Sequence, residues 1–273
     1  MRFLFLGTGT SAGVPAIGCD CPVCTSTDPR DQRLRTAAAL RWTDRAGSPR
    51  TVLLDAGPDL RLQSLRARLD RCDAVLFTHN HVDHTFGLDE VRRFNAVMHA
   101  PIDIYADPHT MDHLRRVYKH IFDRDNNVND SFVATLIPHL IDPHSPIDLH
   151  GLRFTPIPLL HGKLPVLGFR IEPQHPDANG SLFPLAYCTD VSGIPPQSWP
   201  LLRGLRTLVL DALRHRHHPT HLSLAQAVGI AHQVGAPRTY FVHMAHDLPH
   251  AQTNRDLPEG MALAHDGLEL AND

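Results

Sequence analysis

The sequence contains no long hydrophobic run and no excess of positive charge. No stretch reaches the roughly 18 apolar residues that a membrane-spanning helix requires, and Met1 to Leu6 is far shorter than the hydrophobic region of a signal peptide. Lys and Arg number 26 against 29 Asp and Glu, a formal net charge of -3. No overall positive field therefore attracts a nucleic-acid backbone. We expect a soluble, cytoplasmic protein with neither a membrane nor a nucleic acid as its partner.

The composition also excludes a disordered chain. Charged residues make up 20% and hydrophobic residues 42% of the 273 residues, which is an ordinary globular mixture. No internal repeat and no low-complexity linker divides the sequence. The length exceeds that of an average domain but suits one layered α/β fold. These features predict a single domain spanning residues 1–273.

The cysteines do not form the pattern of a disulfide framework. There are five, an odd number, and three of them, Cys19, Cys21 and Cys24, fall within six residues. Such a cluster is more typical of a metal site than of disulfide bonds in a chain without a signal peptide. Cys72 and Cys188 flank apolar runs and are predicted to be packed thiols.

Histidine, in contrast, is abundant, with 21 residues that can bind metals or titrate near neutral pH. Many of them are expected to be solvated surface residues. This expectation covers His99, His109, His113, His120, His150, His175, His232, His250 and His265.

Apolar periodicity predicts a layered arrangement of strands and helices. The predicted strands span residues 3–6, 37–42, 51–54, 74–78, 102–105, 152–158, 166–171, 185–189, 207–210 and 239–243. The predicted helices span residues 59–69, 88–98, 109–122 and 224–234. Ser223 is a plausible N-cap for the last helix, and segments 143–146 and 173–180 are predicted surface loops. This interleaving favours sheets with helices packed outside them.

One short motif carries most of the chemical information. The apolar run 74–77 is followed by Thr78 and then by His79, His81, Asp83 and His84 in an H-x-H-x-D-H pattern. Chance would produce this pattern in roughly one per cent of chains with this histidine content. Imidazole and carboxylate ligands suit zinc, manganese or iron. Four ligands in six residues exceed what one tetrahedral ion takes from one loop, so two ions are predicted.

This motif resembles the signature of the metallo-β-lactamase superfamily. The resemblance implies an α/β fold, an αββα sandwich of two mixed β-sheets flanked by helices. It also implies three further ligands, His161, Asp190 and His243, each of which follows an apolar strand in this sequence. By resemblance, one ion would be held by His79, His81 and His161, the other by Asp83, His84 and His243, with Asp190 bridging the two.

Further residues resemble the phosphodiesterase branch of that superfamily, typified by the PhnP-type phosphoribosyl cyclic phosphodiesterases of bacterial phosphonate metabolism. They are the cysteine cluster, the segment 161–163 and the segments 211–214 and 218–221. The branch carries a separate structural zinc bound by three cysteines and one histidine. That zinc site maps onto Cys19, Cys21, Cys24 and His246.

The same resemblance implies a catalytic mechanism. A hydroxide held between two divalent ions, manganese or zinc, would attack phosphorus in a small, cyclic ribose-phosphate-like phosphodiester. Asp83 and His221 are the predicted catalytic residues, with His221 protonating the leaving oxygen as general acid. A simpler alternative is that His221 belongs to a solvated basic turn with the neighbouring histidines. Candidate phosphate contacts are Lys163, Arg214 and Arg216.

Other functions remain open. The superfamily also contains tRNA-processing endonucleases and thioester or lactone hydrolases, and a non-catalytic metal-binding protein would carry the same ligands. The negative net charge and the absence of a basic insertion argue against the endonuclease. A homodimer is a common state for soluble enzymes of this kind.

Overall fold

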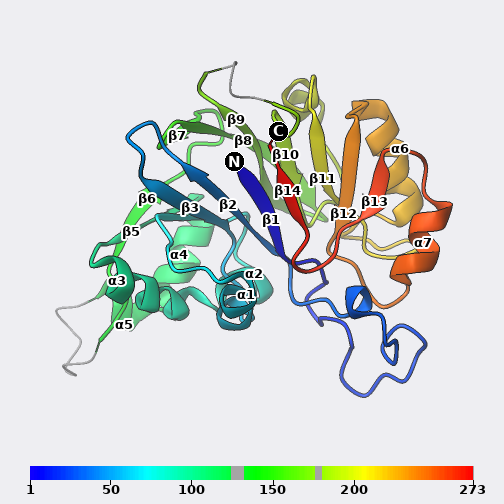
Figure 1. Cartoon of the computed structure of the whole chain (residues 1–273), viewed down its shortest axis with the longest axis horizontal. Helices are drawn as coiled ribbons and strands as arrows, with labels where there is room; N and C mark the ends of the chain where they lie inside the picture. The colour runs from blue at the N-terminus through cyan, green and yellow to red at the C-terminus, as the bar shows by residue number, and fades with distance from the viewer. Residues whose placement is uncertain (124–131, 176–179, 273) are drawn as a thin grey trace.

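The computed structural model describes residues 1–123, 132–175 and 180–272. Two seven-stranded sheets lie face to face at its centre (Figure 1). The first sheet has the order β14 (Glu269–Ala271), β1 (Arg2–Gly7), β2 (Ala37–Thr43), β3 (Pro49–Leu54), β4 (Ala74–Leu76), β5 (Ile102–Ala106), β6 (Leu136–Leu140). The second has the order β13 (Met261–Leu263), β12 (Arg238–Val242), β11 (Thr207–Asp211), β10 (Leu185–Cys188), β9 (Leu164–Pro173), β8 (Leu152–His161), β7 (Ile147–Leu149).

Both sheets are mixed. In the first, strands β3 to β6 are parallel to one another and the other neighbours are antiparallel. In the second, strands β10 to β13 are parallel and β7 to β10 are antiparallel. The parallel strands direct their carboxyl ends to one edge of the sandwich, where the ligand candidates follow them.

Helices cover the outer face of each sheet (Figure 1). On the first sheet lie α1 (Leu60–Ala67), α3 (Arg92–Met98), α4 (Pro108–Val117) and α5 (Lys119–Phe122). The single turn α2 (Val82–Thr85) follows β4 and contains two of the ligand candidates. On the second lie α6 (Leu224–Val234) and α7 (His250–Asp256). Short 3-10 helices occur at Pro29–Asp31, Leu88–Val91 and Pro196–Leu202. The αββα architecture expected from the sequence is confirmed.

Strand β1 shows why these residues form the centre of a sandwich. Successive side chains of a strand point to opposite faces. Phe3 and Phe5 enter the core between the two sheets, whereas Leu4 and Leu6 enter the core beneath the helices of the first sheet. A third core joins the second sheet to α6. A continuous apolar run is therefore required, because both faces of β1 are buried.

The sequence patterns located most of the central strands but not the edges. Strands β6, β7, β13 and β14 were not predicted. β6 contains Pro138, which argues against a central strand but is tolerated at an edge. Predicted helix 109–122 is divided at Tyr118 into α4 and α5, and predicted helix 88–98 begins with a 3-10 turn. Part of the predicted loop 173–180 falls on residues 176–179, outside the described residues.

Other local predictions agree with the structure. Ser223 caps α6, its hydroxyl accepting a hydrogen bond from the Gln226 amide at 3.3 Å. Cys72 and Cys188 are fully buried thiols. One surface prediction is wrong, since His250 is only 4% exposed, enclosed where α7 begins. Within the described ranges, no helix has the length and apolar character needed to cross a membrane.

Candidate metal centre

Six histidine side chains form a closed ring at the edge where the two sheets meet. Neighbouring ring centroids lie 4.4–5.9 Å apart. In order around the ring, these histidines are His79, His81, His161, His221, His243 and His84. All are buried except His81, which marks the open side of the centre.

Strand ends bring these residues together. His79 follows β4, His161 is the last residue of β8, Asp190 follows β10 and His243 follows β12. Asp190 and His243 adopt the left-handed backbone conformation, with φ of 56° and 61°. This conformation is uncommon for residues other than glycine and concentrates at functional sites. It turns the chain abruptly at the end of each strand.

The donor atoms form neighbouring, partly overlapping clusters. In one, His79, His81, His161 and Asp190 each offer a donor atom within 4.8 Å of the others. In another, Asp83, His84 and His243 do the same. Asp190 also groups with His243 and His221. All seven residues predicted as dinuclear ligands are therefore assembled at one place, and their individual roles remain predictions.

The buried imidazole nitrogens and the carboxylate at this centre are arranged as a cation would require. The Nε2 atoms of His79, His84 and His243 are buried and form no hydrogen bond. Two of them face Asp190, with His84 Nε2 3.1 Å and His243 Nε2 3.2 Å from its carboxylate oxygens. Buried polar atoms in native proteins almost always have a partner. A divalent ion coordinated by imidazole nitrogen and carboxylate oxygen would satisfy all of these atoms, so the residues fit a metal.

The pKa shifts are consistent with that conclusion. Burial lowers the pKa of His79 well below its ordinary value, so its ring is a neutral potential ligand. Burial by itself would raise the pKa of Asp190. The surrounding histidines have a larger, opposite effect, so this pKa lies well below the usual range. The bridging candidate is therefore a permanent carboxylate.

Asp55, which the sequence analysis missed, orients two of the rings. Its Oδ2 atom lies 2.8 Å from His84 Nδ1 and accepts a hydrogen bond from Thr78 Oγ1 at 2.9 Å. Thr78 Oγ1 is 3.0 Å from His79 Nδ1. Because each Nδ1 has a partner outside the centre, each Nε2 is directed into it. The sequence did contain a signal for Asp55, because this residue directly follows a predicted strand, as the ligand candidates do.

His221 is held in the same way by a second missed residue, Asp211. His221 Nδ1 lies 3.3 Å from Asp211 Oδ1, and the other oxygen of Asp211 accepts a hydrogen bond from the Leu222 amide at 2.9 Å. The His221 side chain is buried, whereas His215 and His217 of the same turn are exposed. His221 therefore does not belong to a solvated basic turn.

The predicted phosphate contacts differ in their surroundings. Arg214 donates hydrogen bonds to the carbonyls of Arg216 and His217, at 3.4 and 3.2 Å, so its guanidinium braces the turn. Arg216 and Lys163 are exposed.

A second donor cluster joins the N-terminal loop to the segment after β12. The Sγ atoms of Cys19, Cys21 and Cys24 lie 3.2, 3.4 and 3.4 Å from Nδ1 of His246. One ring nitrogen cannot make a hydrogen bond to three thiols at once. Zinc at about 2.3 Å from sulfur and 2.0 Å from nitrogen would set tetrahedral S···N distances near 3.6 Å. The four predicted ligands thus have nearly the geometry of a closed zinc site.

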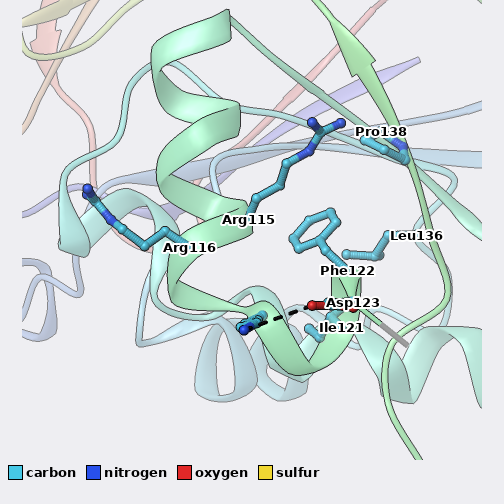
Figure 2. Close-up of a pocket in the computed structure, with 8 residues that line it drawn as sticks. Arg115, Arg116, Ile121, Phe122, Asp123, Leu136 and Pro138 are labelled. Atoms are coloured by element: carbon cyan, nitrogen blue, oxygen red, sulfur yellow. Dashed lines mark ion pairs between the residues drawn. The ribbon is translucent and has the colours of Figure 1, made fainter. Parts of the chain in front are cut away.

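A separate surface hollow of about 760 Å³ contains none of these residues. It lies between α4, α5 and β6 (Figure 2). Arg115 extends across Phe122 toward Pro138, whereas Arg116 points away (Figure 2). The described residues that line this hollow include no histidine, cysteine or hydroxyl side chain and only one carboxylate, so the histidine ring is the candidate active centre.

Comparison with known proteins agrees with this geometry. The sequence model described as the beta-lactamase superfamily domain matches residues 50–244, which include the motif, His161, Asp190 and His243. The chain belongs to this superfamily. A solved structure described as a new diphosphatase from the PhnP family superposes with a TM-score of 0.86 at 43% identity, covering 99% of this chain and 97% of that one.

More distant solved structures share the fold. Zinc-bound PqqB from Methylobacterium extorquens has a TM-score of 0.76 at 20% identity, covering 99% of this chain and all of that one. The short form of human tRNase Z has a TM-score of 0.69 at 19% identity over the full length of both chains. At these identities the likeness concerns the fold alone.

Curated relatives match over part of their own length. A protein named octanoyltransferase from Porphyromonas gingivalis is 35% identical over 275 residues, covering all of this chain and 52% of that protein. Coenzyme PQQ synthesis protein B from Methylobacterium nodulans is 28% identical, covering 61% of this chain and 54% of that protein. The chain thus spans about half the length of these relatives. The donor clusters around Asp190 lie within the region that matches the superfamily model.

Proposed function

We propose that this protein is a dinuclear phosphodiesterase that hydrolyses a small phosphodiester, with a cyclic ribose phosphate as the type of substrate and His221 as general acid. The observation that carries the proposal is the position of His221. It occupies a place in the ring between His161 and His243, and its Nδ1 is engaged by Asp211. Its other nitrogen is free to face a substrate bound at the metal centre.

The residues of the histidine ring would have two roles, metal binding and proton transfer. His79, His81 and His161 would hold one ion and Asp83, His84 and His243 the other, with Asp190 shared between them. Two divalent ions, manganese or zinc, would lower the pKa of a bound water and offset charge on the phosphoryl oxygens. Asp211 would keep the His221 ring oriented through its contact with Nδ1, so that Nε2 faces the leaving oxygen to which it delivers a proton.

The cysteine cluster would have a structural role. A third ion, zinc, would be enclosed by Cys19, Cys21, Cys24 and His246, leaving no open position for a reactant. Such a site ties the N-terminal loop to the segment that carries His243, three residues before His246. We propose that this zinc stabilises the chain without taking part in the reaction.

Hydrolysis of a diphosphate is a second candidate. It is favoured by the PhnP-family neighbour at 43% identity, which is described as a diphosphatase. Attack on a disubstituted diphosphate also takes place at phosphorus, and the same ions and general acid would serve it. The two candidates differ only in the leaving group, an alkoxide or a phosphate.

Acyl transfer has weaker support. The octanoyltransferase name belongs to a protein about twice as long as the portion that this chain matches. The described residues around the histidine ring offer a proton donor and metal ligands. A covalent acyl intermediate would need a positioned nucleophile, and the buried thiols Cys72 and Cys188 lie in the apolar cores.

A single preparation tests these candidates. Metals would be measured by elemental analysis, and turnover would be measured on bis(p-nitrophenyl) phosphate, a ribose cyclic phosphate, a disubstituted diphosphate and an octanoyl thioester. We expect about three metals per chain and chelator-sensitive hydrolysis of the diesters. Preference for the diphosphate would favour the second candidate. At most one metal and no turnover at phosphorus would contradict the proposal.

A further inference from the structure

An exposed apolar surface adjoins the open side of the histidine ring. Val82 is 52% exposed and Phe86 is 47% exposed. Val82 begins α2 and Phe86 is its C-cap residue. The Phe86 amide donates a hydrogen bond to the Val82 carbonyl at 3.0 Å, so the two side chains lie on one helix face. Asp83, His84 and Thr85 of the same turn are buried. The outer face of α2 is therefore apolar and its inner face contributes to the metal centre.

Helix α4 extends this surface and makes it rigid. His113 of α4 stacks on Phe86 with ring centroids 6.4 Å apart and planes 23° from parallel. At the start of α4, His109 Nε2 accepts a hydrogen bond from Asn80 Nδ2 at 3.3 Å. Tyr118 Oη, just after α4, donates a hydrogen bond to the Thr85 carbonyl at 3.0 Å. We call the surface of Val82, Phe86 and His113 the α2 wall.

The α2 wall is continuous with the place where a substrate must enter. His81, the exposed member of the ring, is the residue immediately before Val82. Phe86 lies one helical turn, about 5.4 Å, beyond Val82. A flat substituent on a phosphoryl group held at His81 could therefore cover both side chains. Large apolar side chains at the mouth of a polar site are the usual means of binding the organic part of a ligand.

The position of His221 indicates which part of the substrate lies there. Going around the ring, His161 stands between His81 and His221. The leaving oxygen must lie beside His221, which protonates it. A group on the α2 wall lies beside His81 and is separated from His221, so it is the substituent that stays on phosphorus.

We propose that the α2 wall is a subsite for the retained substituent, and that among acyclic diesters the enzyme prefers those in which this substituent is a flat, largely apolar ring such as an aryl group. In a cyclic ribose phosphate the retained oxygen and the leaving oxygen belong to the same sugar, and one face of that sugar would lie on the wall. This inference rests on the proposed function for the direction of bond cleavage. It assigns Val82 and Phe86 to substrate selection, with no part in metal binding.

Two diesters with the same leaving group test the inference. Bis(p-nitrophenyl) phosphate and methyl p-nitrophenyl phosphate both release p-nitrophenolate, but they retain an aryl and a methyl group respectively. We expect the wild-type KM to be about tenfold lower for the aryl diester. Phe86→Ala and Val82→Ser should raise that KM several-fold to tenfold and leave the KM for the methyl diester and both kcat values nearly unchanged. Phe86→Tyr keeps the ring and should retain the wild-type KM.

Val97→Ser is the matched control, because Val97 is 50% exposed on α3 and does not belong to the α2 wall. Metal content should be equal in all variants. An aryl-to-methyl KM ratio that is the same in the wild type, Phe86→Ala and Val82→Ser would overturn the inference while leaving the proposed function intact.

If neither diester is hydrolysed, a binding measurement tests the α2-wall subsite separately from the proposed phosphodiesterase reaction. Phenylphosphonate and methylphosphonate would be titrated calorimetrically into the purified protein. Tighter binding of the phenyl compound, with a more negative heat-capacity change that Phe86→Ala removes, would support the subsite although the proposed reaction had failed. Equal binding of both compounds would refute the subsite.

Discussion

Asp55 controls the direction of two metal-site histidines from a position that touches no substrate. It contacts His84 directly and reaches His79 through the Thr78 hydroxyl. Its own backbone adopts φ of 66°, a left-handed conformation that asparagine also tolerates. Carboxylates that orient metal-bound histidines typically contribute strongly to metal affinity.

Asp55→Asn should therefore fold but bind its metals about 10–100-fold more weakly, because an amide cannot accept hydrogen bonds from both partners through charged oxygens. The metal affinity of the variant and of the wild type would be measured by competition titration with a coloured chelator. Asp59→Asn serves as a control, since Asp59 also lies just after β3 but pairs with Arg35 on the surface side. Wild-type affinity in Asp55→Asn would show that the rings are oriented by packing alone.

His221 can be tested by varying the leaving group. His221→Ala should leave metal content unchanged and lower turnover by about 10²–10⁴-fold on diesters with poor leaving groups. The loss should be much smaller with p-nitrophenolate, which departs without protonation. His217→Ala, an exposed residue of the same turn, should behave like the wild type. Equal turnover of wild type and His221→Ala on an alkyl diester would remove His221 from the mechanism.

At the scale of elements, the N-terminal loop depends on its four-ligand cluster. The apolar cluster within this loop is small and its buried members are Val14, Val23 and Cys24. So little apolar burial cannot order a long loop by itself, and metal binding commonly supplies the missing free energy.

Cys24→Ser should accordingly lose about one zinc per chain, measured by elemental analysis, and should lower the Tm in thermal unfolding. The dinuclear centre should keep its metals, because none of its seven predicted ligands lies in the N-terminal loop. Thr25→Ser, in the same loop, is the control. A Cys24→Ser protein with full zinc content and an unchanged Tm would contradict the structural role of this site.

Helix α7 begins at a buried histidine that makes stability depend on pH. Burial, together with the positive charge of Arg30 and the neighbouring His265, lowers the pKa of His250 to about 4. The ordinary value is near 6.5. The unfolded chain therefore binds a proton that the folded chain rejects, so stability is lost as pH falls from 6.5 toward 4.

Between pH 7 and pH 5 this group should remove about 1–2 kcal/mol from the free energy of unfolding. His250→Leu should show a smaller loss over the same interval, measured by urea unfolding at both pH values. The carboxylates and the other histidines titrate in both proteins, so the difference isolates His250. Parallel pH dependence in the two proteins would refute this assignment.

At the scale of the whole molecule, the net charge of this chain disfavours binding to a nucleic acid. The net charge is -3, and the structural likeness to human tRNase Z, at 19% identity, concerns the fold alone. Binding to tRNA requires many phosphate contacts and weakens steeply with salt. We expect no salt-sensitive retention of tRNA in a filter-binding assay at 50 mM salt, with the human enzyme as the positive control. Tight retention that disappears at 200 mM salt would revive the nuclease interpretation.

The ligand candidates could be predicted because their signals are local. His79, His81, Asp83 and His84 form one contiguous motif, and His161, Asp190 and His243 each follow an apolar run. The central strands were predicted for the same reason, since burial on both faces leaves a continuous apolar segment. Edge strands such as β6 do not show a continuous apolar segment, because one side of each strand is unpaired and tolerates proline.

The sequence by itself therefore determined the metal-binding motif, which depends on spacing along the chain. The resemblance that this motif carries implied the superfamily, the sandwich and the remaining ligand candidates. Only the tertiary structure decided that Asp55 and Asp211 orient the rings, that His250 is enclosed and that Phe86 borders the open side of the centre. These features depend on contacts between segments that are distant in sequence, such as the 29 positions between Asp55 and His84. Their formation depends on how the sheets and helices pack, and local periodicity carries no record of that packing.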